Sequence, residues 1–225
     1  MEIIKQLEAK IESIFGDDKT GHSMTHLWRT LDFALKIHAH EGGDKVVIAV
    51  SAFLHDIHRI MQTKEKRFVP PVESLPLVRQ LMSDLPLTDE QKNHICHAIE
   101  HHEEYAFSKK GVTVKDIESK ILQDADNLDM LGAIGLARQL EYGYAHNHPI
   151  FVPDIPLVQG DFTEGDPSPS TLHSMVRKTL RLADAMNTKT ARKMARELNK
   201  FQIEFVRLVQ KEYIAPSYNS IFASP

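Results

Sequence analysis

Cysteine and long apolar runs are both scarce in this sequence of 225 residues. Cys96 is the single cysteine, so the chain cannot form an internal disulfide, and a chain of this length can bury about 70% of its unfolded surface without one. The longest apolar run, residues 46–54, is far shorter than the roughly 20 residues of a membrane helix. Met1 is followed by Glu2 and Lys5 and by no apolar signal segment. These features argue against a secreted or membrane protein, and we expect a cytoplasmic one.

A basic surface is also missing. The 27 Lys and Arg residues are outnumbered by 31 Asp and Glu residues, the net charge is −4, and the charges are scattered along the chain. We therefore expect no nucleic-acid partner, because nucleic-acid binders need clustered basic residues. What the sequence does have is 13 histidines. Histidine is the commonest metal ligand and carries protons near neutral pH, so the composition indicates histidine chemistry.

Apolar residues recur at helical spacing through most of the chain, and no segment shows the strict alternation of a strand. The first part of the chain predicts helices over residues 3–15, 25–41 and 46–57. Gly42 and Gly43 end the second of these helices, and Asp44 caps the third. Residues 59–73 are expected to form a loop, after which Ser74 caps a short helix that ends near Leu85.

The remaining elements are helical as well. Thr88 and Gln91 form a capping-box pattern that opens a helix through Glu104. Residues 113–145 predict two helices with a bend near Gly132, and residues 171–184 and 188–213 predict two more. Residues 147–170 hold five prolines and two glycines and predict a long connection beside or over a cleft. The sequence thus indicates one all-α domain over residues 1–225, with roughly eight helices and a C-terminal tail at 214–225.

A His-Asp pair, His55 and Asp56, ends the otherwise apolar third helix. An unpaired buried carboxylate costs several kcal/mol, so Asp56 needs a partner. Candidate partners are His26, the histidine-rich helix that contains His94, His97, His101 and His102, and the segment QDADNLD at 123–129. Metal sites are built from imidazoles and carboxylates that converge from separate segments in this way.

The order of a lone His, then His-Asp, then a distant Asp resembles the HD-domain superfamily of metal-dependent phosphohydrolases. The resemblance extends to longer segments and covers roughly residues 1–213. These segments are similar to those of small stand-alone bacterial HD hydrolases, some of which act on nucleotides as pyrophosphohydrolases. They are GHSMTHLWR (21–29), AFLHDI (52–57), QDADNLDMLGAIGLAR (123–138) and LADAMNTKTAR (182–192).

The resemblance implies an HD-type helical bundle with a divalent cation, whether Mn, Mg, Co, Ni, Fe or Zn, bound by His26, His55, Asp56 and Asp126. It implies hydrolysis of a phosphoester or phosphoanhydride in a small phosphorylated substrate, most simply a nucleotide. A metal-bound water would be the nucleophile, with Asp56 or Asp126 accepting its proton. His102 or His101 would protonate the leaving oxygen.

Basic residues are the expected phosphate contacts. Arg29 lies three residues after His26 and so shares its helix face, where its guanidinium can grip two phosphate oxygens. Arg138 and Lys178 match basic positions of the bacterial subgroup and are further candidates, although salt bridges to acidic residues are the simpler explanation for each of them alone. Residues 70–76 depart from the histidine-containing helix start of that subgroup.

Several alternatives remain open at this level. Asp124, Asp126 and Asp129 are all possible ligands. On a helix, however, Asp124 faces away from Asp126, while Asp129 shares its face and can orient a ligand. His22 is either a ligand or a helix cap, and the histidines at 94–102 are either solvated or near the metal. The whole chain could instead be a non-catalytic metal and nucleotide-binding module, or a di-iron oxygenase on the same bundle. The oligomeric state and the number of metal ions stay undetermined.

Overall fold

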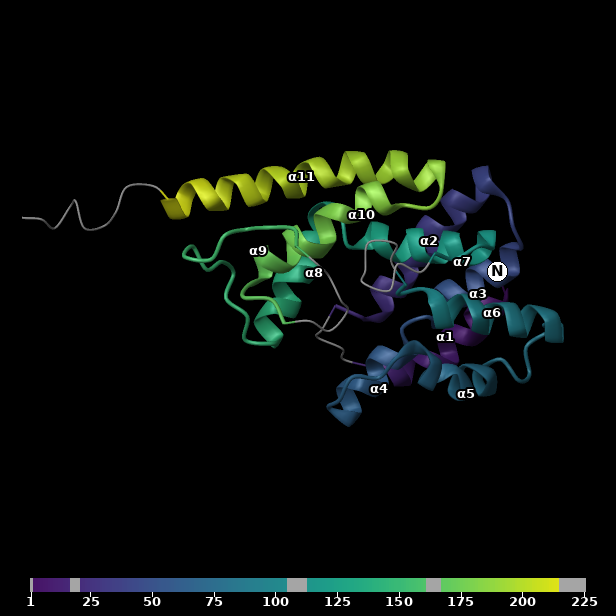
Figure 1. Cartoon of the computed structure of the whole chain (residues 1–225). Coiled ribbons are helices and arrows are strands. Elements are labelled where there is room, and N and C mark those ends of the chain that lie inside the picture. The colour runs from purple at the N-terminus through teal and green to yellow at the C-terminus, as the bar shows by residue number, and fades with distance from the viewer. Residues whose placement is uncertain (1, 17–20, 105–112, 161–166, 215–225) are drawn as a thin grey trace, which may run out of the picture.

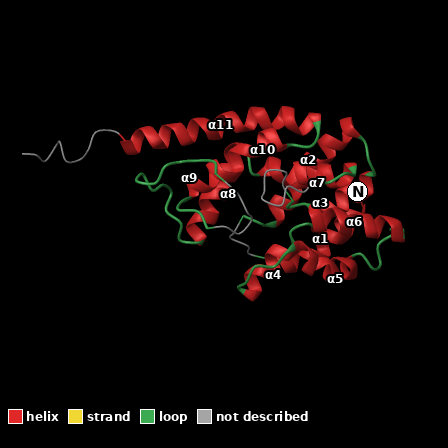
Figure 2. Cartoon of the chain, viewed as in Figure 1, coloured by secondary structure: helices red, strands yellow, loops and turns green. Residues whose placement is uncertain are grey.

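The computed structural model describes residues 2–16, 21–104, 113–160 and 167–214. Every regular element among them is a helix, and these residues contain no strand (Figure 2). The all-α fold class is therefore confirmed. None of the described helices has the length and apolar character that crossing a bilayer requires.

The helices follow one another along the chain, with longer segments between α6 and α7 and between α8 and α9. Their bounds are α1 Glu2–Phe15, α2 Met24–Glu41, α3 Lys45–Leu54, α4 Ile57–Glu65, α5 Pro71–Leu81, α6 Asp89–His101, α7 Ile117–Asp129, α8 Gly132–Ala145, α9 Thr171–Ser174, a π-helical turn Met175–Thr179, α10 Leu180–Ala185 and α11 Lys189–Ile214.

The main apolar core surrounds α3. Residues 47–54 of this helix are all buried, as the uninterrupted apolar sequence predicts. Helix α2 packs against both α3 and α7, and α6 covers α3 from another direction (Figure 1). The core therefore holds together the helices from which the expected metal ligands come.

A second, smaller apolar cluster lies under the C-terminal part of the chain. Leu136 of α8, Leu172 of α9, Met175 of the π-helical turn and Val206 of α11 are buried in it, and Phe151 from the long connection joins them. Figure 1 shows α8, α9 and the far part of α11 on the side of the molecule opposite α5 and α6. The described residues thus form two apolar clusters.

The N-terminal caps of α3 and α6 are those predicted from the sequence, whereas the start of α5 differs from the prediction. Asp44 accepts a hydrogen bond from the Val46 amide at 2.8 Å, and Thr88 forms its capping box. The expected loop at 59–73 is wrong, because α4 continues to Glu65. The expected start at Ser74 is also wrong: α5 begins at Pro71, whose fixed φ suits a first helical position, and it ends at Leu81 rather than near Leu85.

Three further helices differ from expectation, because α3 ends at Leu54, α6 ends at His101, and the expected helix at 171–184 is divided into α9, the π-helical turn and α10. Other expectations are met. Helices α7 and α8 meet at residues 130–131, next to the predicted bend at Gly132. Gly135 allows this close return, because a Cβ at that position would lie 2.1 Å from the Met130 carbonyl carbon. Residues 147–160 and 167–170 contain no helix, in agreement with the predicted connection. The predicted tail lies outside the described residues from 215 onwards.

Asp124 of α7 is a structural anchor on the face of α7 that turns away from the candidate ligands. It is fully buried, and its carboxylate accepts hydrogen bonds from the amides of Asn187 at 2.7 Å and Thr188 at 2.8 Å. The side chains of the same two residues donate at 3.0 and 2.7 Å. Asp124 therefore fixes the start of α11 to the middle of α7, and the predicted orientation of this residue is confirmed.

We expect Asp124→Ala to lower the free energy of unfolding by about 3 kcal/mol, because the buried donors at residues 187–188 lose their acceptor. Metal affinity should stay unchanged. Urea unfolding followed by circular dichroism measures the first quantity. The control is Asp184→Ala, which removes an exposed carboxylate. Equal unfolding midpoints for the two variants would contradict this role.

Candidate metal centre and cleft

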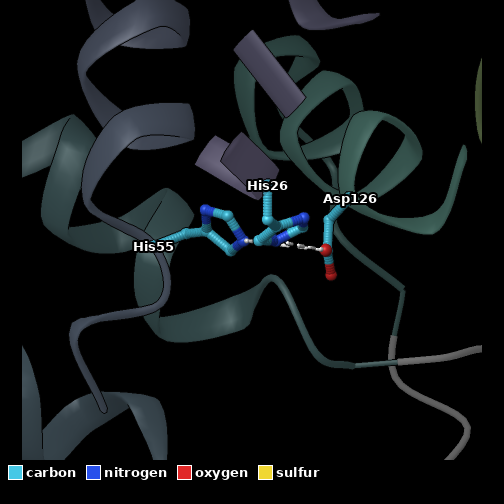
Figure 3. A group of neighbouring side chains, drawn as sticks. All are labelled: His26, His55 and Asp126. Carbon is cyan, nitrogen blue, oxygen red and sulfur yellow. Dashed lines mark hydrogen bonds and ion pairs between the residues drawn. The ribbon is translucent and has the colours of Figure 1, made fainter. Parts of the chain in front are cut away.

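Four side chains from three separate segments converge at the centre of the bundle. His26 comes from α2, His55 and Asp56 come from the junction of α3 and α4, and Asp126 comes from α7. Figure 3 shows the two imidazoles and the Asp126 carboxylate directed toward one another. The structure therefore brings together all four residues predicted as ligands.

The donor atoms are spaced as the ligands of one ion would be. His26 Nε2 lies 3.1 Å from His55 Nε2, 3.1 Å from Asp56 Oδ2 and 3.4 Å from Asp126 Oδ1. His55 Nε2 lies 3.5 Å from the same Asp56 oxygen and 3.6 Å from the Asp126 oxygen. Ligand atoms about 2.1 Å from a shared cation are separated by roughly 3.0 to 3.4 Å, depending on the coordination geometry.

Hydrogen bonds at Nδ1 of His26 and His55 determine the tautomer of each imidazole, and so whether Nε2 carries a proton. His26 Nδ1 lies 2.7 Å from Asp129 Oδ2, and His55 Nδ1 lies 3.0 Å from the Ala52 carbonyl oxygen. A carboxylate and a carbonyl only accept, so each Nδ1 carries the proton and each neutral ring presents a lone pair at Nε2. The two lone pairs then face each other and the oxygens of Asp56 and Asp126, an arrangement that only a cation or a proton between them can stabilise.

The electrostatics of the cluster agree with this interpretation. Burial opposes the charged form of His55, yet the carboxylates of Asp56 and Asp126 raise the pKa of His55 to about 9. Burial also works against ionised carboxylates, yet His55 and neighbouring histidines hold the pKa of Asp56 and of Asp126 well below the usual range. Asp56 Oδ2 is buried and accepts no hydrogen bond. A divalent cation fits this donor set of two imidazoles and two carboxylates.

Asp129 supports the cluster from behind. This buried carboxylate accepts a hydrogen bond from His26 Nδ1. It also accepts two from Arg29, whose Nε and Nη2 atoms lie 2.6 and 2.9 Å from its two oxygens. Arg138 adds a contact of 2.8 Å and also donates to the Gly21 carbonyl. The structure thus places the guanidinium of Arg29 on Asp129, and the predicted phosphate contact of Arg29 stays a prediction.

A cavity of about 420 Å³ opens at the cluster. Asp56 and Asp126 line one part of it, and its walls carry the cationic side chains of Arg59, Arg138 and Lys178. The π-helical turn places Lys178 in the wall, and π-helical turns are frequent at functional sites. The cavity extends to α8 and the connection after it, where Tyr142, His146 and His148 line it.

Sequence reasoning missed Arg59 and Glu103, both of which line this cavity and pair with each other. Arg59 follows Asp56 by three residues, so the spacing argument that selected Arg29 would have found it as well. His22 also lines the cavity, and burial is the main reason why its pKa falls to about 3. His102 is buried with Nδ1 at 2.6 Å from the Ile99 carbonyl oxygen. Its predicted role as a proton donor remains a prediction.

The other histidines of α6 lie apart from these four residues. His94 and His97 contact Asp116 at the start of α7, at 3.1 and 3.3 Å, and His101 contacts Glu104. None of the three lines the cavity. The expectation that they are solvated helix residues fits their partial exposure.

Comparison with known proteins agrees with the fold and the site. Residues 24–131 match the HD domain family, a range that contains all four candidate ligands. The uncharacterized protein YpgQ of Bacillus subtilis is 29% identical over 211 residues, which is 92% of each chain. An HD-superfamily hydrolase from Bacillus thuringiensis has 28% identity and a TM-score of 0.68, with 96% of this chain and 98% of that chain covered.

Two further structures are informative. A protein from Lactobacillus plantarum superposes with a TM-score of 0.81 at 25% identity, over 96% of this chain and 98% of its own. The structure of Bacillus subtilis YpgQ in complex with ADP has a TM-score of 0.66 at 26% identity, over 92% and 96%. The all-α bundle thus has a hydrolase-like fold of the HD type, and its His and Asp cluster could hold a metal ion. Residues 24–131 therefore match an HD domain, and the chain is similar to an HD-superfamily hydrolase over nearly its whole length.

We expect Asp126→Ala to lose metal outright, and Asp129→Ala to weaken metal affinity by roughly 10- to 100-fold because His26 loses the group that orients it. Competition with a chromophoric chelator measures both affinities. Asp32→Ala, which removes an exposed carboxylate of α2, is the matched control. Wild-type affinity in the Asp129 variant would show that the contact to His26 does not orient a ligand.

Proposed function

We propose that this protein is a metal-dependent phosphohydrolase that cleaves a phosphoester or phosphoanhydride bond, with a nucleotide as the substrate. One observation carries the proposal: two of the four converging candidate ligands, Asp56 and Asp126, line a cavity whose walls also hold three cationic side chains. A divalent cation and basic side chains around one cavity suit a phosphorylated substrate, because both stabilise phosphate oxygens. The ADP complex of the YpgQ relative supports the nucleotide class.

The residues of the chain have distinct tasks in this proposal. His26, His55, Asp56 and Asp126 would hold the cation, which supplies a water of lowered pKa and polarises a phosphoryl oxygen. Asp126 and Asp56 line the cavity as ionised carboxylates, so either can accept the proton of an attacking water. The position of both carboxylates within the donor cluster keeps that water oriented.

Cationic side chains would bind the phosphates. Arg138 and Lys178 reach the cavity from α8 and from the π-helical turn. Arg29 would act on the substrate indirectly, because it forms an ion pair with Asp129, and Asp129 also forms an ion pair with Arg138. Removing one charge-assisted hydrogen bond to a phosphate costs about 1.5 to 3 kcal/mol, or roughly 10- to 150-fold in kcat/KM.

We expect nucleotide hydrolysis to vanish with a chelator, to return with added Mn²⁺, Mg²⁺, Co²⁺ or Ni²⁺, and to be absent in His55→Ala. The measurement is product release from a panel of nucleotides and phosphoesters, with each cation supplied separately. His40→Gln, an exposed histidine of α2, serves as the control. Turnover that survives the chelator would contradict the proposal, and binding without any product would favour a non-catalytic module.

We further expect Lys178→Met to lower kcat/KM at least 10-fold, mainly through KM, while the metal content stays at the wild-type level. The reason is the loss of one positive charge from the cavity wall. Lys189→Met removes an exposed lysine at the start of α11 and is the control. If Lys178→Met and Lys189→Met give the same KM, then Lys178 does not contact the substrate.

A further inference from the structure

A separate group of histidine and carboxylate side chains lies on the surface of α6 and α7, apart from the cavity. Its members are His94 of α6, Asp116 just before α7 and Glu118 of α7, and one donor atom of each lies within 4.8 Å of the other two. His94 Nε2 is 3.1 Å from Asp116 Oδ1 and 3.4 Å from Glu118 Oε2. None of these three residues lines the cavity or belongs to the four candidate ligands.

Backbone amides hold both carboxylates of the group in place. The Asp44 amide donates to Glu118 Oε1 at 2.7 Å, and the Ser119 amide donates to Asp116 Oδ1 at 2.8 Å. Gly43 permits the first contact, because its φ is +94° and a Cβ there would lie 3.1 Å from Glu118 Oε1. Outer hydrogen bonds of this kind orient carboxylates that bind metals. The fold therefore directs two carboxylates at one imidazole nitrogen.

A proton on His94 satisfies this arrangement only in part. Carboxylates only accept hydrogen bonds and Nε2 carries at most one proton, so a single N–H faces two acceptors. Burial opposes the ionisation of Asp116, yet hydrogen bonds from Ser119 and His94 lower its pKa to about 2, and the group is a carboxylate at neutral pH. A divalent cation between the three donor atoms binds both carboxylates and the imidazole lone pair at once.

A fourth donor is within reach of the group. His97 lies three residues after His94 and so shares its face of α6, and His97 Nε2 is 3.3 Å from Asp116 Oδ2. The side chain of His97 is 50% exposed, so it can turn toward an ion without disturbing the core. Two imidazoles and two carboxylates then supply the four nitrogen and oxygen donors of a tetrahedral zinc site.

The group lies where α3, α6 and α7 pack together (Figure 1). The contact of Glu118 with the Asp44 amide joins α7 to the start of α3, and Gln91 of α6 donates to Asp44 Oδ2 at 3.0 Å. An ion bound by His94 would add a direct link between α6 and α7. Because α7 also carries Asp126, this link would stabilise the part of the fold that holds the candidate metal centre.

We propose that His94, His97, Asp116 and Glu118 bind a zinc ion that links α6 to α7 and stabilises the fold. The zinc site is independent of the proposed function, because it shares no residue with the candidate metal centre and none of its residues lines the cavity. The partial exposure of both histidines gives the ion a path from solvent. Zinc has no redox chemistry, so its task in this site is structural.

The experiment uses the full-length Asp126→Ala chain as the parent, so that the candidate metal centre is disabled and the zinc site stays intact. The metal-free parent and the Asp126→Ala/His94→Gln chain are titrated with Zn²⁺ by calorimetry and with Co²⁺ by visible absorption. The parent should bind one ion more than the double variant, with the intense absorption of four-coordinate Co²⁺. The same difference of one ion is expected between the wild-type chain and His94→Gln.

Zinc should also raise the thermal unfolding midpoint of the parent, because only the folded chain brings the ligands of α6 and α7 together. The expected rise is roughly 4 °C or more when free zinc is about 100 times its dissociation constant. His94→Gln should abolish this rise and keep the parent's midpoint in chelator, which shows that the variant is folded. His97→Gln should lower the zinc affinity, and an unchanged affinity would remove His97 from the ligand set.

His101→Gln is the matched control, because His101 lies one turn further along α6 and contacts Glu104 instead. In the parent background it should bind zinc as the parent does. Equal stoichiometry with and without His94→Gln would overturn the proposal, as would loss of the ion in His101→Gln alone. Either result would leave the proposed function standing. Absence of hydrolysis with every cation would refute the proposed function and leave the zinc site standing.

Discussion

The geometry of the centre depends on one buried carboxylate, Asp129. It is 2% exposed and is contacted by His26, Arg29 and Arg138, so its burial is compensated by ionic and hydrogen-bonded partners from α2 and α8. The same contacts fix the ring of His26 and its tautomer, and they join three helices behind the cluster. Removing either arginine would leave a partly unpaired charge in the interior, which is costly. The orientation of the first ligand is thus tied to the packing of the bundle.

The two apolar clusters of the described residues position different parts of the candidate site. The main core sets the positions of α2, α3, α6 and α7, and so of every candidate ligand. The smaller cluster positions α8 and the π-helical turn, which bring Arg138 and Lys178 to the cavity. Rigidly held candidate ligands in one part of the cavity and cationic side chains in another fit the proposed hydrolysis of a phosphorylated small molecule.

Much of this could be predicted from the sequence, because periodicity defines buried helix faces directly. The spacing within 124–129 gave the correct opposite orientations of Asp124 and Asp129, since both lie on one regular helix. The stretch 59–73 was mispredicted because its charged residues hide the amphipathic α4, which has only a few buried positions. Arg59 and Glu103 escaped notice because their roles come from contacts between α4 and the end of α6, and spacing along a single chain segment cannot reveal such contacts.

The most direct test of the central claim is the anomalous scattering of a crystal grown with Mn²⁺. The account predicts a strong peak about 2.0 to 2.3 Å from His26 Nε2, His55 Nε2, and one oxygen each of Asp56 and Asp126, at the inner end of the cavity. A peak that avoids these four atoms, or no peak at saturating Mn²⁺, would contradict the assignment of this cluster as a metal centre.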